Sequence, residues 1–173
     1  MGKGLLNGMI FNVSWLVLLL THSNVVAPLL VIAHLALHRV LFLQQQREWL
    51  LIALITAGGL LLDQLIFAAS ILTVDDTRGW PPLWLGCLWP IFATTLNHVF
   101  KALQQHLLLA SLLGAVGGTG SYIAGVGMTS VSFGTPIWSP LAIALIWAIL
   151  MPLMCIAAGR LMAPEGSNDT AIA

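Results

Sequence analysis

The chain has 173 residues, of which 59% are hydrophobic and only 7% are charged. Soluble globular domains carry about 25% charged residues, so this composition excludes a water-soluble protein and predicts an integral membrane protein. Six Lys and Arg residues balance six Asp and Glu residues, and no basic cluster is present that could follow a phosphate backbone. We therefore expect membrane lipid, and no nucleic acid, as a partner.

Six segments are apolar enough for membrane-spanning helices, each of which needs about 20 apolar residues. We therefore predict an all-α polytopic membrane protein, a bundle of six transmembrane helices that forms one domain over residues 1–162. Residues 163–173 are polar and are predicted to form a disordered cytoplasmic tail. In chain order the six segments are Leu5–Thr21, Asn24–Leu43, Trp49–Leu72, Pro82–Phe100, Leu107–Met128 and Ile137–Met162.

The positive charges between these segments predict the orientation of the bundle. Lys and Arg gather in cytoplasmic loops, which is the positive-inside rule. One side of the predicted bundle carries five such residues, whereas the other carries only Arg78, close to Asp75 and Asp76. Both termini are therefore predicted to lie in the cytoplasm. The five residues are Lys3, Arg39, Arg47, Lys101 and Arg160.

Glycines recur in the fifth segment at four-residue spacing. Gly114 pairs in this way with Gly118, and Gly117 pairs with Ser121 and Gly125. Small residues so spaced let helix backbones approach closely, which predicts a helix-packing face. The alternative, a phosphate-binding glycine loop, would need a P-loop lysine and a flanking strand, and the run has neither.

The fourth segment carries a polar stripe on one face of the predicted helix, given a 3.6-residue period. Polar side chains in hydrocarbon are costly, so we expect the stripe to face the bundle interior and to meet polar groups of the second or third segment. Asn97 and His98 are either hydrogen-bonding groups that hold helices together or a ligand site. Pro90 leaves the carbonyl of Gly86 without a helical donor, which predicts a kink. The stripe is Pro90, Thr94, Asn97, His98 and Lys101.

The first three segments also carry deep polar residues. Asn12, His34 and Asp63 are predicted near the middle of the membrane, and His38 and Arg39 closer to the cytoplasm. A lone carboxylate at the depth of Asp63 must be neutral or paired, with His34 as a candidate partner. Asp63 is therefore either half of a structural ion pair or a functional acid. The whole candidate cluster is Asn12, His34, His38, Arg39, Asp63, Thr94, Asn97 and His98.

Metal binding is the less favoured interpretation of the histidines. His34 and His38, four residues apart, could offer two nitrogens, with further ligands from Asp63 or His98. The chain has no HExxH motif and no Cys/His ligand spacing. We therefore predict no metal site and no cofactor.

The run Leu-Trp-Pro-Ile-Phe-Ala-Thr-Thr-Leu-Asn-His, from Leu88 to His98, lies between Asp63 and a Leu-Gly-Ala-Val-Gly-Gly run that ends at Gly118. These features resemble an uncharacterised family of small bacterial inner-membrane proteins, a domain of unknown function, over the chain to about Met162. Its signature, Trp-x-x-Phe-Ala-Thr-Thr-Leu-Asn-His, is intact here. The resemblance implies a multi-pass protein of the bacterial inner (cytoplasmic) membrane. Genes of the family often lie beside cyclopropane-fatty-acid-synthase-like enzymes, which implies a role in envelope lipid.

The resemblance and the deep polar residues favour a membrane-embedded accessory protein of envelope lipid or fatty-acyl modification, with lipid-modifying enzymes as partners. The alternative is a small proton-linked transporter of a lipid or hydrophobic solute, with Asp63 and His34 as its proton-linked groups, although the two halves show no repeat. An intramembrane enzyme would use Asp63, His34 or His98 as acid and base. The sequence has no recognisable catalytic motif and does not indicate the oligomeric state.

Overall fold

The computed structural model of the protein describes residues 2–74 and 79–163, and these form an all-α fold that is 75% helical. The predicted tail, apart from Ala163, and the charged loop around Arg78 lie outside the described residues. Among the described residues, four helices are long and apolar enough to cross a membrane. They are α1 (Lys3–Thr21), α3 (Arg47–Ala68), α6 (Leu107–Met128) and α7 (Trp138–Met162).

The remaining elements are shorter. Helix α2 has 16 residues, which at 1.5 Å per residue span about 24 Å, less than the roughly 30 Å of a hydrocarbon core. Two short strands pair in antiparallel fashion, with Thr73 opposite Ser132. These elements are α2 (Val26–Leu41), β1 (Leu72–Val74), α4 (Leu83–Gly86), α5 (Leu88–Ala93), the 3₁₀ helix η1 (Lys101–Gln105) and β2 (Val131–Phe133).

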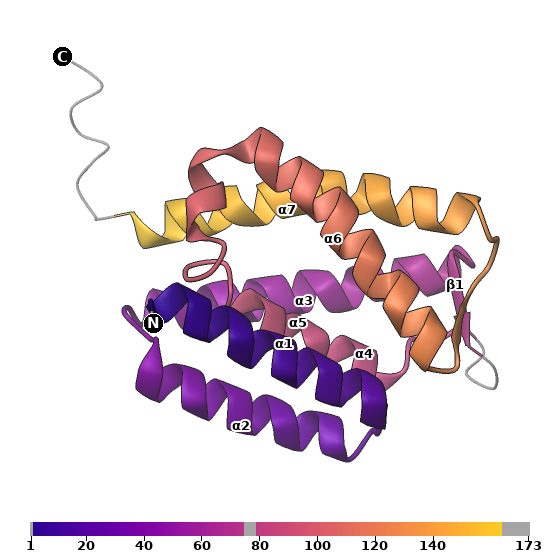
Figure 1. Ribbon diagram of the computed structural model, residues 1–173, viewed down its shortest axis with the longest axis horizontal. Helices are drawn as coiled ribbons and strands as arrows, with labels where there is room; N and C mark the ends of the chain where they lie inside the picture. Colours follow the sequence, from indigo (N-terminus) through magenta and orange to yellow (C-terminus); the bar gives the residue numbers. More distant parts are fainter. Residues whose placement is uncertain (1, 75–78, 164–173) are drawn as a thin grey trace.

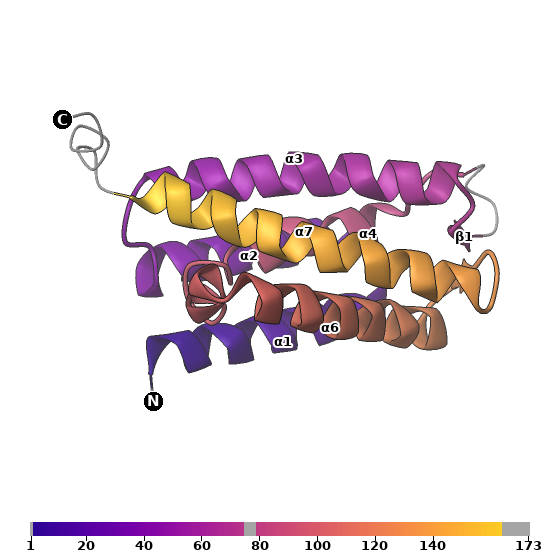
Figure 2. The same cartoon turned by 90° about the horizontal axis from the view of Figure 1, so that it is seen from above.

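Helices α1, α3 and α7 run roughly along the long axis of the molecule, and α6 runs obliquely to it (Figures 1 and 2). The start of α1 and the end of α7 lie toward one end, and β1 lies at the other end (Figure 1). Helix α5 contacts α1, α2 and α3, so this short helix occupies the interior of the bundle. Helices α6 and α7 form the most extensive helix pair.

Large apolar side chains cover the outer faces of the helices. Val13 of α1, Leu61 of α3, Val116 of α6 and Leu145 of α7 are each more than 60% exposed. A surface of this kind is unfavourable in water and suits contact with lipid tails. The exposed apolar faces therefore agree with the apolar composition of the four long helices, and both are compatible with a multi-pass membrane protein.

The predicted fourth helix, Pro82–Phe100, is wrong as one continuous element. Helix α4 ends at Gly86, Cys87 forms a turn, and α5 begins at Leu88. Pro90 has no N–H to donate to the carbonyl of Gly86, so the helical hydrogen-bond pattern is incomplete at this point. The local break that Pro90 predicts is therefore present, next to Gly86.

The chain also leaves the α-helix after Ala93. Residues 94–100, which we call the turn segment, form consecutive turns that lead into η1. The Thr94 and Thr95 hydroxyls donate to the carbonyls of Ile91 and Phe92. Such side-chain bonds offer the backbone carbonyls an alternative to helical partners. The four polar residues of the stripe that follow Pro90 therefore do not lie on one face of an α-helix.

The glycine face of α6 has two parts with different roles. A Cβ atom added to Gly114 or Gly118 would meet Trp147 of α7, and at Gly114 also Met151. These two glycines therefore let α6 and α7 approach closely, as predicted. A Cβ atom added to Gly117 or Gly125 would have no atom within 4 Å. The second predicted set of small residues, Gly117, Ser121 and Gly125, therefore faces open space, and we call it the open glycine row.

Candidate functional site

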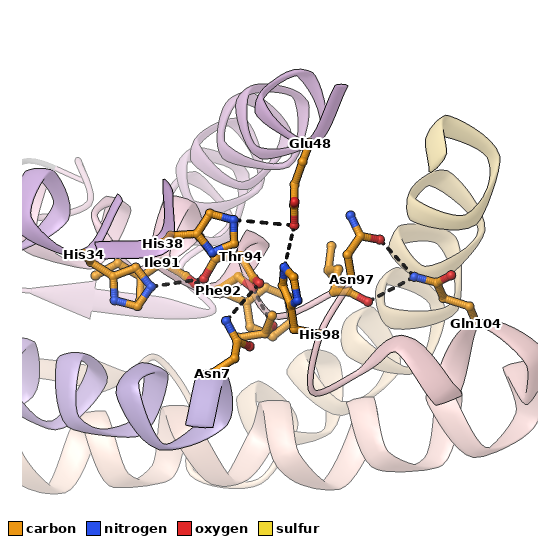
Figure 3. Close-up of polar contacts among 12 residues, drawn as sticks. Asn7, His34, His38, Glu48, Ile91, Phe92, Thr94, Asn97, His98 and Gln104 are labelled. Carbon is orange, nitrogen blue, oxygen red and sulfur yellow. Dashed lines mark hydrogen bonds and ion pairs between the residues drawn. The ribbon is translucent and has the colours of Figure 1, made fainter. Parts of the chain in front are cut away.

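A buried hydrogen-bond chain, the His34 network, joins α1, α2 and the turn segment. Figure 3 shows its members His34 and Thr94. His34 Nδ1 lies 2.9 Å from Ser14 Oγ, and its Nε2 lies 3.0 Å from Thr94 Oγ1. Thr94 Oγ1 gives its only hydrogen to the Ile91 carbonyl at 2.6 Å, so it accepts from Nε2–H of His34. In the neutral ring Nδ1 then accepts from Ser14, so these contacts select one tautomer.

Three further side chains, which we call the histidine–glutamate triad, meet between α2, the first turn of α3 and the turn segment (Figure 3). His98 Nε2 lies 2.8 Å from Glu48 Oε1, and His38 Nε2 lies 3.5 Å from the same oxygen. All three side chains are at most 3% exposed. The turn segment therefore meets both the second and the third helix, through Thr94 and His98.

Asn97 does not join these groups. Its Oδ1 accepts from Gln104 Nε2 at 3.1 Å, and the same nitrogen donates to the Leu96 carbonyl at 3.0 Å. Gln104 belongs to η1, so this contact folds the turn segment back onto the element that follows it (Figure 3). Asn97 therefore stabilises the local chain reversal, and among the hydrogen bonds of the described residues its side chain bonds to this neighbouring element in place of α2 or α3.

Asp63 lies in a separate group on α3. Its Oδ2 accepts from Trp89 Nε1 at 2.7 Å, and its Oδ1 accepts from the Tyr122 hydroxyl at 3.4 Å. The side chain is buried, and no cationic side chain among the described residues forms an ion pair with it. The expected partnership of Asp63 with His34 is therefore wrong, because each has its own neutral partners.

A cavity of about 470 Å³ opens beside Asp63. Its volume is within the roughly 300–1,000 Å³ of small-molecule sites, which are mostly apolar with a few polar groups. Its walls come from α1, α3, α4, α5, α6 and α7, and the open glycine row of α6 forms one side. The aromatic lining is Phe11, Trp15, Trp84, Trp89, Phe92, Phe100, Tyr122 and Trp147. Such a cavity can hold an extended apolar group next to a carboxyl.

The predicted cluster of eight residues is thus divided. His34 and Thr94 share one network, His38 and His98 share another, and Asp63 lies with Trp89 and Tyr122. Asn12 donates to the carbonyl of Gly8 in its own helix and lines the cavity. Arg39 is exposed and joins none of these groups.

Glu48, the acidic centre of the triad, is not among the site residues predicted from the sequence. It lies in the first turn of α3, where acidic residues are common because of the helix dipole, so it looked like a boundary residue. Its burial depends on His38 and His98, which are far away in the sequence. The only available signal was the scarcity of acidic residues, six in the chain.

The comparisons with known proteins identify a family and no individual relative. Residues 4–153 match the family described as "Protein of unknown function (DUF2878)". No curated protein and no solved structure matches the chain. The match covers the helices that form the His34 network, the triad and most of the cavity. The chain therefore belongs to the DUF2878 family of proteins of unknown function.

Proposed function

We propose that the protein is a membrane-embedded accessory protein of envelope lipid or fatty-acyl modification that holds an acyl chain in the cavity beside Asp63. The observation that supports this most is the cavity itself, an aromatic-walled space of about 470 Å³ inside a bundle of apolar helices. An acyl chain has the matching shape and polarity, and membrane lipid is present at high local concentration around such a bundle.

The polar end of the cavity restricts the ligand further. A carboxylate has about four sites that accept hydrogen bonds, and Asp63 uses two of them for Trp89 and Tyr122. The remaining sites suit a ligand that donates, such as a hydroxyl group next to the acyl chain. The proposed ligand is therefore an acyl lipid with a donor group near the chain.

We also propose six membrane crossings in a bacterial inner membrane, with both termini in the cytoplasm. The charge asymmetry supports this arrangement, since Lys3, Lys101 and Arg160 fall on one predicted side. The starts of α1 and η1 and the end of α7 also lie toward the same end of the molecule (Figure 1). In this arrangement α2 and the α4–η1 segment complete two of the crossings despite their short helices.

Proton-linked transport of a lipid or hydrophobic solute is the second candidate. One observation favours it: Asp63 is a buried carboxyl without a cationic partner among the described residues, and it lines the cavity. Intramembrane carboxyls of this kind serve in proton relays. A pH gradient that drives uptake into proteoliposomes by the wild type, and not by Asp63→Asn, would favour transport over the accessory role.

Two glycine variants test acyl binding in the cavity. Gly117 lines the cavity and has space for a side chain, so Gly117→Leu should fill the cavity without a clash. Gly127→Leu is the matched control, because Gly127 also has free space on α6 but does not line the cavity. Lipids with brominated acyl chains quench nearby tryptophans, including Trp89 and Trp147 of the cavity wall.

We expect saturable quenching in the wild type and Gly127→Leu, and at least about tenfold weaker binding, or ~1.4 kcal/mol, in Gly117→Leu. Equal quenching in all three proteins would refute the cavity as the binding site. In cells, the lipid profile of a deletion strain should be restored by the wild type and Gly127→Leu only. A normal lipid profile in the deletion strain would refute the role in lipid modification. It would not affect the test of acyl binding, which depends on the quenching measurement alone.

A further inference from the structure

The histidine–glutamate triad is separate from the cavity beside Asp63, because none of its three residues lines that cavity. It brings together one ligand atom each from α2, α3 and the turn segment, and these atoms lie within 4.8 Å of one another. The residues are Glu48 and two histidines, an unusual group for the interior of a chain with so few charges. What the triad binds is therefore a question independent of the proposed function.

A simple ion pair does not account for His38. The His98–Glu48 contact at 2.8 Å satisfies one ring nitrogen and one carboxylate oxygen. His38 is 1% exposed, and neither of its ring nitrogens makes a hydrogen bond within the described residues. Its Nε2 nevertheless points at Glu48 Oε1 from 3.5 Å. Because buried polar groups almost always have partners, an imidazole held in this way indicates a ligand shared with the carboxylate.

The spacing of the three atoms fits a metal ion. Zn²⁺ binds histidine nitrogen and carboxylate oxygen at about 2.0–2.2 Å in tetrahedral geometry, which places neighbouring ligand atoms about 3.3 Å apart. The distances of 2.8 and 3.5 Å from Glu48 Oε1 lie on either side of that value. Small side-chain adjustments would therefore bring all three atoms to one ion.

The surroundings of the triad also suit a metal. The Phe42 and Trp49 rings pack against His38 with centroids 5.9 and 6.2 Å away, and Phe42 lies 5.5 Å from the His98 ring. A hydrophobic shell of this kind limits the access of solvent to the imidazoles. Glu48 also lines a polar cavity of about 240 Å³, which offers a hydrated ion a route to the carboxylate and space for water.

We propose that His38, Glu48 and His98 bind a first-row divalent cation, Zn²⁺ or Fe²⁺, through two imidazoles and one carboxylate. Both metals use this ligand set, Zn²⁺ in catalytic sites and Fe²⁺ in sites with open positions. Three protein ligands leave at least one position open, so the site suits a metal that holds water or substrate. The three ligands could not be recognised from the sequence, because positions 38, 48 and 98 match no spacing motif of metal ligands.

Metal titration of the full-length protein tests this assignment. The protein is purified in detergent with an affinity tag that contains no histidine, treated with a chelator, and titrated with Zn²⁺ or, without oxygen, Fe²⁺. We expect about one ion per chain by elemental mass spectrometry, with X-ray absorption showing two imidazole ligands. Because N/O sites generally bind Zn²⁺ more tightly than Fe²⁺, the native metal is identified from the ion that copurifies with the protein before chelation.

The variants place the ion at the triad. Glu48→Gln and His38→Ala should weaken binding at least about 100-fold, because loss of an outer-shell partner alone costs 10–100-fold. His22→Ala and His106→Ala remove exposed histidines and should bind as the wild type does. Glu48→Gln keeps the side-chain shape, so it is the variant expected to remain folded. A wild type that binds neither metal, or a Glu48→Gln variant that binds like the wild type, would overturn the proposal.

Discussion

Thr94 and Thr95 are neighbours with the same side chain and different surroundings. Both hydroxyls donate to a carbonyl three residues earlier in the chain. Only Thr94 also accepts a hydrogen bond from another helix, at 3.0 Å from His34 Nε2. The pair therefore separates the effect of a local hydroxyl bond from that of an interhelical bond.

A double-mutant cycle measures this interhelical bond. Thr94→Val combined with His34→Leu should show a coupling energy of about 0.6 kcal/mol, and at most about 1.7 kcal/mol, the range of side-chain bonds between membrane helices. The free energy of unfolding in detergent is the measurement. Thr95→Val is the control and should be additive with His34→Leu, since Thr95 makes no contact with His34 in the hydrogen bonds of the described residues. Equal coupling for both threonines would contradict the network.

The identity of the residues was enough to predict the burial of several polar groups, but it did not predict their hydrogen-bond partners. Burial of His34, His38, Asp63 and Thr94 is confirmed, because polar groups in an apolar bundle must turn inward. Arg39, in contrast, is exposed, since it can extend from the end of α2. Partners could not be predicted because they depend on helix packing, which one sequence does not contain.

The segment of residues 82–100 shows how an element can be predicted correctly at one end and wrongly at the other. The hydrophobic pattern of residues 82–100 predicts a helix, and α4 and α5 follow it as far as Ala93. Beyond that point turns replace the helix, and they direct Thr94 toward α2 and His98 toward α3. A continuous helix would have placed both on nearly the same face. The turn segment therefore connects residues 82–93 to two different helices.

The α6–α7 pair gives a prediction for helix packing. Gly118→Leu places a side chain against the Trp147 ring, and overpacking of this kind costs about 1–3 kcal/mol. Gly117→Leu, one residue earlier on the same helix, meets open space and should not be destabilised. Thermal unfolding in detergent should therefore show a lower midpoint for Gly118→Leu alone. Identical midpoints for the two variants would contradict the observed face of contact between α6 and α7.

The polar groups and the cavity give the bundle two chemically different regions. The triad lies at the beginning of α3, near the start of α1, whereas the cavity is bounded by the central aromatic residues of the bundle, such as Trp89 and Trp147. The composition predicted the all-α membrane fold, because about 20 apolar residues per segment leave few other solutions. The cavity was not predictable, since it arises where the open glycine row of α6 faces α1 and α5.

The proposed six-span arrangement, with both termini in the cytoplasm, would place the triad near the cytoplasmic surface and the cavity within the lipid. Labelling of single cysteines in intact cells tests it most directly, in a chain whose native Cys87 and Cys155 are replaced by alanine. Asn24 and Gln45 flank α2, Trp80 precedes α4, and Gln105 is the last residue of η1; all four are exposed.

With six crossings, a membrane-impermeant maleimide should label Asn24→Cys and Trp80→Cys in intact cells. Gln45→Cys and Gln105→Cys should react only after the membrane is permeabilised, because these positions lie on the side that carries most of the Lys and Arg residues. Labelling of both members of either pair from the same side would show that the intervening short helices do not cross, and would contradict the six-span account.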